Sequence, residues 1–327
     1  MVRYEFTVED LAKTRFAISP MWETTAAIQA LRVPGVFALH LPWMKQVRSE
    51  IGELDLSLVL ALLPSQEEGY AADFLTPPPS TPLADFETEL ELVRLTPPDQ
   101  IRNDVEILIA SGNPREALRP YLDDPARAVG KLAEVLREFW RRAIEPHWAR
   151  IKALLETDLL YRSRRLTEGG VSLLFADLHP LVVWSDDGVE VTMEYAERVE
   201  LGGRGLVLVP SAFSCDKPST MTQPPWQPTV VYAARGVGLL WDSASAPREA
   251  LANVLGRSRA TLLSDLDAPR TTTELAERLE MTPGGVSQHL TALRDSGLVS
   301  ARRNGRQVLY CRSALADELV GEGASAN

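Results

Sequence analysis

The stretch TTTELAERLEMTPGGVSQHLTALRDSGLVSARRNGRQVLYCR, residues 271–312, decides the fold of the C-terminal part of the chain. Thr271 and Glu274 have the spacing of a capping box, in which each side chain accepts a hydrogen bond from the other residue's backbone N–H. A second start signal is Thr282 followed by Pro283, because threonine caps a helix N-terminus and proline has a fixed φ that suits the first helical position. The sequence therefore predicts two consecutive helices joined by a short turn.

Apolar residues recur at helical spacing in both predicted helices, so each helix has one face to bury. These residues are Leu275, Ala276 and Leu279 in the first helix and Val286, Leu290 and Leu293 in the second. Two short helices joined by a tight turn form a helix-turn-helix, and the second helix of that motif can enter the major groove of DNA. A further helical segment is expected over residues 248–266, split near Gly256.

Two strand-like runs, residues 298–303 and 307–312, follow the second helix. Asn304-Gly305 lies between them and favours a tight hairpin, because both residues tolerate positive φ. Together with the two helices, this hairpin predicts a winged helix. Residues 298–312 contain four arginines and no acidic residue. We expect such a wing to contact DNA phosphates, although a basic run is also typical of a solvated hairpin face.

The segment from Thr282 to Leu298 (TPGGVSQHLTALRDSGL), with TELAERLEM before it and VSARRNGRQVLY after it, resembles the winged helix-turn-helix of ArsR-type bacterial transcriptional regulators. The resemblance covers residues 248–315. The N-terminal region, with RFAISP near its start and FADLHP at residues 175–180, resembles an uncharacterised domain fused to such modules in actinobacterial regulators. The resemblance implies a homodimer on a pseudo-palindromic DNA operator, and repression more often than activation.

The chain departs from that family in two respects. Glu280 stands where the turn often has glycine, and a positive φ there would cost on the order of 1 kcal/mol. Metal-sensing members use paired cysteines or clusters of histidine and carboxylate. Here Cys215 and Cys311 are far apart and the four histidines are scattered, with Asp177 and His179 as the one pair near ligand spacing. Since a metal site needs three or four converging ligands, we expect neither a metal nor a cofactor.

The helical wheel of the second helix predicts which side chains face the DNA. Gln288 and Thr291 lie opposite the buried stripe. A glutamine amide can bond adenine N6 and N7 together, and a threonine can contact a neighbouring thymine, whereas Ser287 and Arg294 suit phosphate oxygens. The alternative is that Gln288 is only a solvated helix residue. The candidate DNA-binding residues are Thr282, Ser287, Gln288, His289, Thr291, Arg294, Arg302, Arg303, Asn304 and Arg306.

Length and charge set the frame for the rest of the chain. The 327 residues are typical of about two domains. There are 34 basic and 45 acidic residues, and the formal net charge is −11. Residues 251–327 hold nine of each sign, so the acidic excess lies in residues 1–250. With no apolar run of membrane-spanning length and no signal-peptide pattern, we expect no membrane association and a cytoplasmic location.

The expected fold class is α+β, with a C-terminal winged helix-turn-helix over residues 248–315 and a larger N-terminal helical domain with a small β-sheet. Residues 1–245 are expected to form a sensory or dimerisation domain, helical over 1–166 and sheet-containing over 171–241. Residues 316–327 are expected to be a flexible tail.

Three further features of the N-terminal region can be predicted. Proline prevents a helix or a central strand over residues 76–82, TPPPSTP. The apolar stripe over residues 125–166 predicts a long helix or helix pair interrupted near Pro146. Residues 242–247, DSASAP, are typical of a linker.

No pattern of nucleophile, base and orienting residue is recognisable, so we expect no catalytic residues. The expected function is a sequence-specific DNA-binding regulator, and the resemblance implies a repressor. Control by a small ligand bound in the N-terminal domain is a further expectation, and an apolar pocket enclosed by the N-terminal sheet and its proline-rich loop, residues 217–228, would support it. The alternatives are an enzyme with an appended winged helix, and a winged helix that binds protein.

Overall fold

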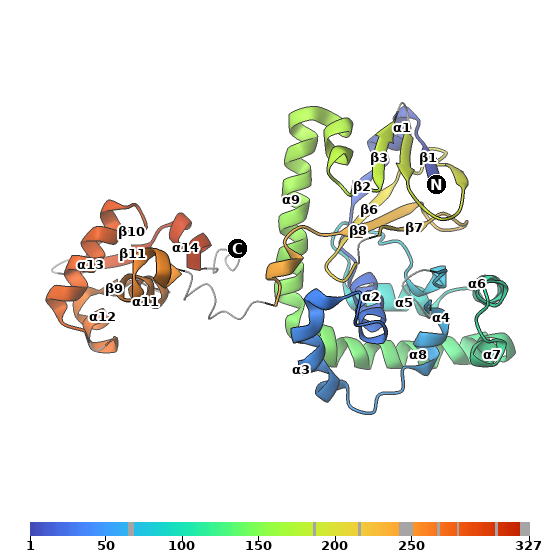
Figure 1. Cartoon of the computed structure of the whole chain (residues 1–327), viewed down its shortest axis with the longest axis horizontal. Helices are drawn as coiled ribbons and strands as arrows, with labels where there is room; N and C mark the ends of the chain where they lie inside the picture. The colour runs from blue at the N-terminus through green and yellow to red at the C-terminus, as the bar shows by residue number, and fades with distance from the viewer. Residues whose placement is uncertain are drawn as a thin grey trace. The chain divides into compact units, whose positions relative to one another are not determined.

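The computed structural model describes residues 1–64, 69–185, 188–214, 217–241, 251–266, 269–279, 281–304 and 307–320. The chain divides into two compact units, Met1–Trp241 and Asp242–Asn327 (Figure 1). Helices and small sheets occur together, which confirms the α+β class. The predicted linker over residues 242–247 lies outside the described residues.

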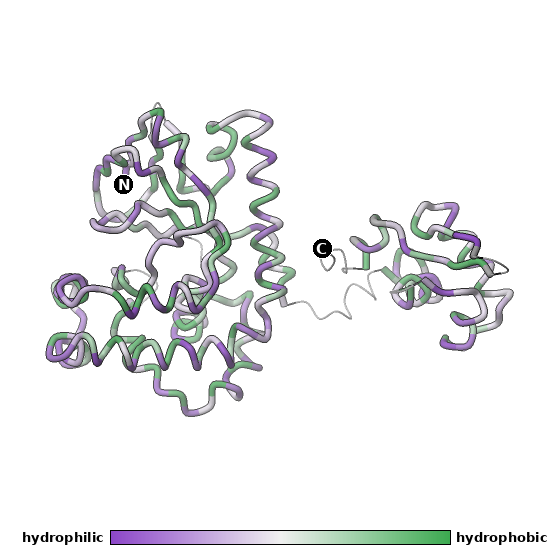
Figure 2. Tube along the Cα trace, turned by 180° about the vertical axis from the view of Figure 1, so that it is seen from behind, coloured by the Kyte–Doolittle hydropathy of each residue, from purple (hydrophilic) through white to green (hydrophobic). Residues whose placement is uncertain are grey.

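Most of the first unit is helical. Its α-helices are α1 (Val8–Lys13), α2 (Pro20–Arg32), α3 (Leu41–Ile51), α4 (Ser57–Leu62), α5 (Phe86–Arg94), α6 (Pro98–Ala110), α7 (Arg115–Asp123), α8 (Pro125–Phe139) and α9 (Glu145–Ala176). The shorter helices are η1 (Ala38–His40), η2 (Asp73–Leu75), η3 (Trp140–Ile144) and η4 (Val237–Leu239). Figure 2 shows hydrophobic and hydrophilic positions alternating along α8 and α9, as expected of amphipathic helices. Among the described residues, none of these helices has the length and apolarity needed to cross a bilayer.

The predicted interruption near Pro146 is confirmed. The α-helical hydrogen bonding of α8 gives way to one stretch of π-helix, η3, before α9 begins with Pro146 in its first turn. Proline is tolerated there because a first-turn N–H has no intrahelical partner. Near its far end α9 bends sharply at Gly169 and Gly170, and the φ of +68° at Gly170 is one that glycine adopts without strain.

Two four-stranded sheets complete the first unit. The first has the order β3 (Val182–Ser185), β4 (Gly188–Val191), β1 (Val2–Glu5) and β5 (Glu197–Glu200). The second has the order β2 (Arg15–Phe16), β6 (Val207–Ser211), β8 (Thr229–Ala233) and β7 (Ser219–Met221). In the first sheet β1 is antiparallel to β4 and parallel to β5, and in the second the parallel strands β2, β6 and β8 are joined by antiparallel β7.

The prediction that residues 1–166 are helical is wrong at the N-terminus. Residues 2–5 form β1 and residues 15–16 form β2. Val2 and Tyr4 alternate with polar residues and are fully buried. The partner strands of β1 are β4 and β5, which lie almost at the other end of this unit's sequence. Long-range pairing therefore decides the conformation of residues 2–5. One small sheet was expected over residues 171–241. The strands of this region instead belong to two sheets, of which one contains β1 and the other contains β2.

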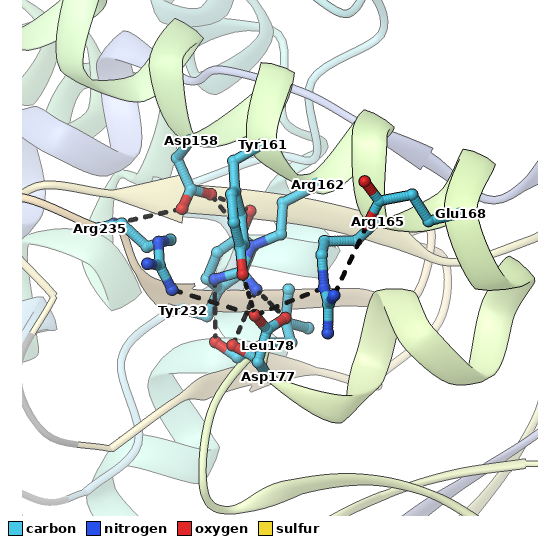
Figure 3. Close-up of polar contacts among 9 residues, drawn as sticks. All are labelled: Asp158, Tyr161, Arg162, Arg165, Glu168, Asp177, Leu178, Tyr232 and Arg235. Carbon is cyan, nitrogen blue, oxygen red and sulfur yellow. Dashed lines mark hydrogen bonds and ion pairs between the residues drawn. The ribbon is translucent and has the colours of Figure 1, made fainter.

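A polar network ties the bent end of α9 to strand β8 (Figure 3). Arg162 is 1 % exposed and donates a hydrogen bond of 2.7 Å to the Asp177 carboxylate, while its Nε lies 3.5 Å from the Asp158 carboxylate. Tyr232 of β8 donates to the same Asp158 at 2.7 Å. The guanidinium group of Arg235 lies over the ring of Tyr161, 4.1 Å from its centroid. Burial of Arg162 and Asp158 is tolerated because each lies beside an opposite charge, and Asp158 also accepts the hydrogen bond from Tyr232.

The second unit contains helical residues 251–255, α11 (Arg257–Asp265), β9 (Arg270–Thr271), α12 (Thr272–Arg278), α13 (Pro283–Asp295), β10 (Val299–Asn304), β11 (Gln307–Arg312) and α14 (Ala314–Val320). Strand order is β10, β11, β9. The predicted split of the first helix at Gly256 is confirmed, with a φ of +83° at that glycine. Pairing of β9 with β11 adds a third strand to the predicted hairpin.

The predicted flexible tail over residues 316–327 is wrong at its start. Residues 314–320 form α14, in which Ala316 is fully buried and Asp317 forms an ion pair with Arg312. Leu315 and Leu319 stay exposed, so the short helix buries little apolar surface, which explains why its sequence resembles a tail. Residues 321–327 lie outside the described residues.

Candidate nucleic-acid interface

The first helix of the helix-turn-helix, α12, is capped as predicted. The Thr271 hydroxyl accepts from the Glu274 backbone N–H at 3.2 Å, and the Glu274 carboxylate accepts from the Thr271 backbone N–H at 2.7 Å. These hydrogen bonds from Thr271 hold the pKa of the Glu274 carboxyl below its usual value. The capping box therefore fixes the start of α12.

The second helix, α13, also begins as predicted. The hydroxyl of Thr282 accepts from the backbone N–H of Gly285 at 3.2 Å, and Pro283 occupies the first turn. In the turn before it, the Met281 backbone N–H donates to the Ala276 carbonyl at 2.9 Å. Thr282 was predicted to bind DNA, and its side chain is already engaged in this cap. Glu280, where strain was expected, lies outside the described residues.

The buried face of α13 is the predicted one. Val286 and Leu290 are fully buried and Leu293 is 1 % exposed. They belong to one cluster with Leu275 and Leu263 of the neighbouring helices. Since these side chains fix the rotation of α13 about its axis, the opposite side of the helix faces solvent.

The solvent face of α13 carries most of the predicted reading residues. Ser287, Gln288, Thr291 and Arg294 are exposed, and His289 is half-buried. Gln288 makes no side-chain hydrogen bond with any described residue, so its amide is available to a ligand. The Thr291 hydroxyl donates to the Ser287 carbonyl at 2.9 Å, which leaves its methyl group and one acceptor position outward. Nδ1 of His289 is buried without a hydrogen-bond partner among the described residues.

The wing is a regular antiparallel ladder in which Arg302 pairs with Leu309 and Arg303 with Val308. Both arginines are exposed. Asn304 was expected to start the turn, but it pairs with Gln307 as the last residue of β10. The strand pairing therefore extends one residue further than predicted. Residues 305–306, which include the predicted DNA contact Arg306, lie outside the described residues.

The fourth arginine of the basic run has a structural role. The Arg312 side chain is 6 % exposed and lies 2.8 Å from the Asp317 carboxylate, which belongs to α14. Its Nη1 also donates to the Leu263 carbonyl at 3.4 Å. Sequence analysis missed this pairing because Asp317 lies beyond the recognised motif. The charge available on the wing is therefore smaller than the count of arginines indicates.

The geometry defines a winged helix-turn-helix whose second helix presents a polar face next to an exposed basic hairpin. Residues 261–301 match the family model described as bacterial regulatory protein, arsR family, and residues 99–238 match a family of unknown function (DUF5937). These two matches confirm the resemblance inferred from the sequence. The arsR match supports a DNA-binding transcription regulator. Searches of curated proteins and of solved structures found no match.

Metal ligands and catalytic groups were not expected. Within the described ranges, no three histidine, cysteine, aspartate or glutamate side chains converge in a way that could hold a metal ion. Asp177 and His179, the pair nearest to ligand spacing in the sequence, have other partners: Asp177 accepts from Arg162, and Nδ1 of His179 accepts from the Leu181 backbone N–H at 3.1 Å.

Proposed function

We propose that this chain is a cytoplasmic transcription regulator that reads an operator through α13 and holds it with the wing. The observation that carries the proposal is the solvent face of α13. It is polar, lies opposite a fully buried stripe, and is flanked by exposed Arg302 and Arg303. A helix of this kind fits the major groove, while a basic hairpin meets phosphates or a narrow minor groove.

Each predicted contact residue suits a particular part of the DNA. Gln288 has a free amide for adenine N6 and N7. Thr291 offers a methyl group to thymine and an acceptor to a base amino group, because its own proton is used within the helix. Ser287 and Arg294 serve as phosphate contacts, and so do Arg303 and Arg306. Thr282 acts through the cap that orients the start of α13.

We also propose that the protein acts as a homodimer. Exposed apolar side chains lie on both terminal helical segments of the second unit. Val254 is 82 % exposed, and Leu315 and Leu319, one helical turn apart in α14, are 54 % and 44 % exposed. A second copy of this surface would cover them. Replacing both leucines by lysine should convert a dimer to a monomer in analytical ultracentrifugation, whereas an unchanged mass would place the dimer contact elsewhere.

The direct test is selection of genomic fragments by the purified full chain, followed by footprinting. Two protected half-sites about one helical turn apart are expected of a two-fold protein. Gly284→Asp is the diagnostic variant. A Cβ at this exposed position meets no atom within 4 Å, and an acidic residue in the first turn favours the helix, so the fold is retained. The added negative charge should abolish DNA binding, and Gly284→Ala is the matched control.

Repression and control by a small ligand are the regulatory part of the proposal. They predict that the operator overlaps or follows the promoter it controls, and that a ligand of the first unit lowers operator affinity. The arsR match favours a regulator over an enzyme with an appended winged helix. Turnover of a substrate by the first unit would favour the enzyme. Failure to bind any duplex at low salt would favour a protein-binding winged helix.

A further inference from the structure

The first unit has a cleft of about 560 Å³ between α5, the end of α8, η3 and the start of α9. Its size lies within the range of small-molecule sites. The named strands and the proline-rich loop, residues 217–228, where an apolar pocket would have indicated a small-molecule sensor, are not part of its lining.

Aromatic rings line one side of this cleft. Phe86 and Trp140 stack with their planes 6° apart and their centroids 4.5 Å apart, and Trp148 meets Trp140 edge-on at 5.1 Å. Phe86 and Trp140 are 5 % and 8 % exposed, so they are fixed by packing, while Trp148 is half-buried. Rigid aromatic faces favour a flat unsaturated ligand or a cation, which the ring quadrupole attracts.

The charged groups of the lining leave carboxylates without cationic partners. Arg137 is held by Glu87 in a bidentate pair with distances of 2.9 and 2.7 Å. Arg141 is likewise held by Glu138 at 2.7 Å, outside the lining. Asp85 and Glu145 also line the cleft, and in the described part of the chain neither forms an ion pair. Lys152, the third cation of the lining, lies 3.7 Å from the Glu156 carboxylate. Because each cation of the lining has a carboxylate partner of its own or shares one, Asp85 and Glu145 are the lining carboxylates left to attract a positive charge.

The π-helix η3 also contributes to the lining of this cleft. It supplies both Trp140 and Arg141 to the lining. A π-helical turn is rare and occurs frequently at functional sites. In this chain it turns Trp140 onto Phe86 at the point where α8 passes into α9.

We propose that this cleft binds a planar aromatic cation, with the rings stacked against the aromatic side and the positive charge directed to Glu145 and Asp85. This names the ligand class for the regulator proposed above. Binding itself stands on the cleft alone, whereas its regulatory consequence rests on the proposed DNA-binding function.

The first turn of α9 connects this cleft to the end of the first unit. Glu145 and Trp148 face the cleft, and His147 between them packs edge-on against Trp241 with ring centroids 5.6 Å apart. Trp241 is the last residue of the first unit. A ligand that shifts this helical turn therefore acts on the residue from which the chain continues to the winged helix.

The test uses three flat tricyclic probes that differ in charge at neutral pH: 9-aminoacridine (cation), acridine (neutral) and acridine-9-carboxylate (anion). Binding to the full chain without DNA is measured by calorimetry and by quenching of tryptophan fluorescence. We expect the cation to bind one per chain and about tenfold more tightly than the neutral probe, with the anion weakest. Equal affinity for the three probes would overturn the proposal.

Substitutions of residues that line the cleft show whether the probe binds there. Glu145→Gln, at an exposed position in the first turn of α9, should remove most of the preference for the cation, and Trp148→Leu should weaken binding of both cation and neutral probe. Glu116→Gln and Trp184→Phe are the matched controls outside the cleft and should bind as the parent does. Unchanged affinity in both cleft variants would overturn the proposal. Cation binding by a chain that binds no DNA would support the cleft and contradict the proposed function.

Discussion

The indole Nε1–H of Trp241 donates a hydrogen bond to Nδ1 of His40, with 2.8 Å between the two nitrogen atoms. His40 is 2 % exposed and stacks on Phe213, while Trp43 stacks on the Trp241 ring. Burial lowers the pKa of His40 to about 4, so the imidazole is neutral near neutral pH and its Nδ1 remains an acceptor. The last residue of the first unit is thus anchored in an aromatic box.

Trp241→Phe should lower the free energy of unfolding of the first unit by about 1 to 3 kcal/mol, because the ring packing is largely kept and Nδ1 of His40 loses its donor. Urea unfolding followed by circular dichroism measures the change. Trp226→Phe is the matched control, since the Trp226 indole nitrogen is buried without a partner among the described residues. Equal losses in the two variants would show that the hydrogen bond contributes nothing.

Arg162→Met tests the polar network of Figure 3. The variant leaves Asp158, which is fully buried, without its cationic neighbour. Removal of one partner of a buried ion pair typically costs about 3 to 5 kcal/mol, and we expect a loss in that range. Arg164→Met on the same helix is the control, because the Arg164 side chain is 79 % exposed and its pair with Glu168 should contribute less than about 1 kcal/mol. A loss no larger than that of the control would mean that water replaces the guanidinium group.

Glu89 should make the first unit less stable as the pH rises. Burial raises the pKa of this carboxyl from its usual 4.5 to about 8, although it accepts a hydrogen bond from the Met21 backbone N–H. The folded state then holds a proton that the unfolded state releases above pH 4.5, so the stabilisation is complete below that pH and is lost as pH rises through 8. Glu89→Gln keeps the acceptor and cannot ionise. The variant should gain on the order of 2 kcal/mol over the parent at pH 9 and little at pH 5.

The winged helix could be predicted from the sequence because its signals are local. The caps at Thr271 and Thr282 and the stripe through Val286 and Leu290 need only neighbouring residues, and the structure contains each of them. The exposure of Gln288 follows from the same stripe by helical geometry.

The first unit could not be predicted to the same degree because its decisive contacts are distant in sequence. Strand β1 pairs with residues 188–191 and 197–200, and four residues are too few to show their period without these partners. The ion pair of Arg312 depends on a helix beyond the motif. The cleft arises where α5, from residue 86, meets η3 and α9, a meeting that no local pattern encodes.

Replacing Arg302, Arg303 and Arg306 by alanine together should weaken binding to all DNA sequences and flatten its dependence on salt. Each lost phosphate contact reduces the slope of log affinity against log salt by about one unit, since fewer counterions are released. Fluorescence anisotropy over a range of salt concentrations gives the slope. Arg115→Ala with Arg119→Ala, in the first unit, is the control pair. A parental slope in the triple variant would show that the wing stays off the DNA.

The central claim, that α13 reads base sequence, is tested most directly by the affinity of Gln288→Ala for the selected operator and for a scrambled duplex of equal length. The Gln288 side chain is exposed and supports no described contact, so the fold is unaffected. We predict a loss of about 1 to 3 kcal/mol on the operator, almost none on the scrambled duplex, and relaxed preference at one base pair in each half-site. Equal losses on the two duplexes, or no loss on the operator, would contradict base reading by this helix face.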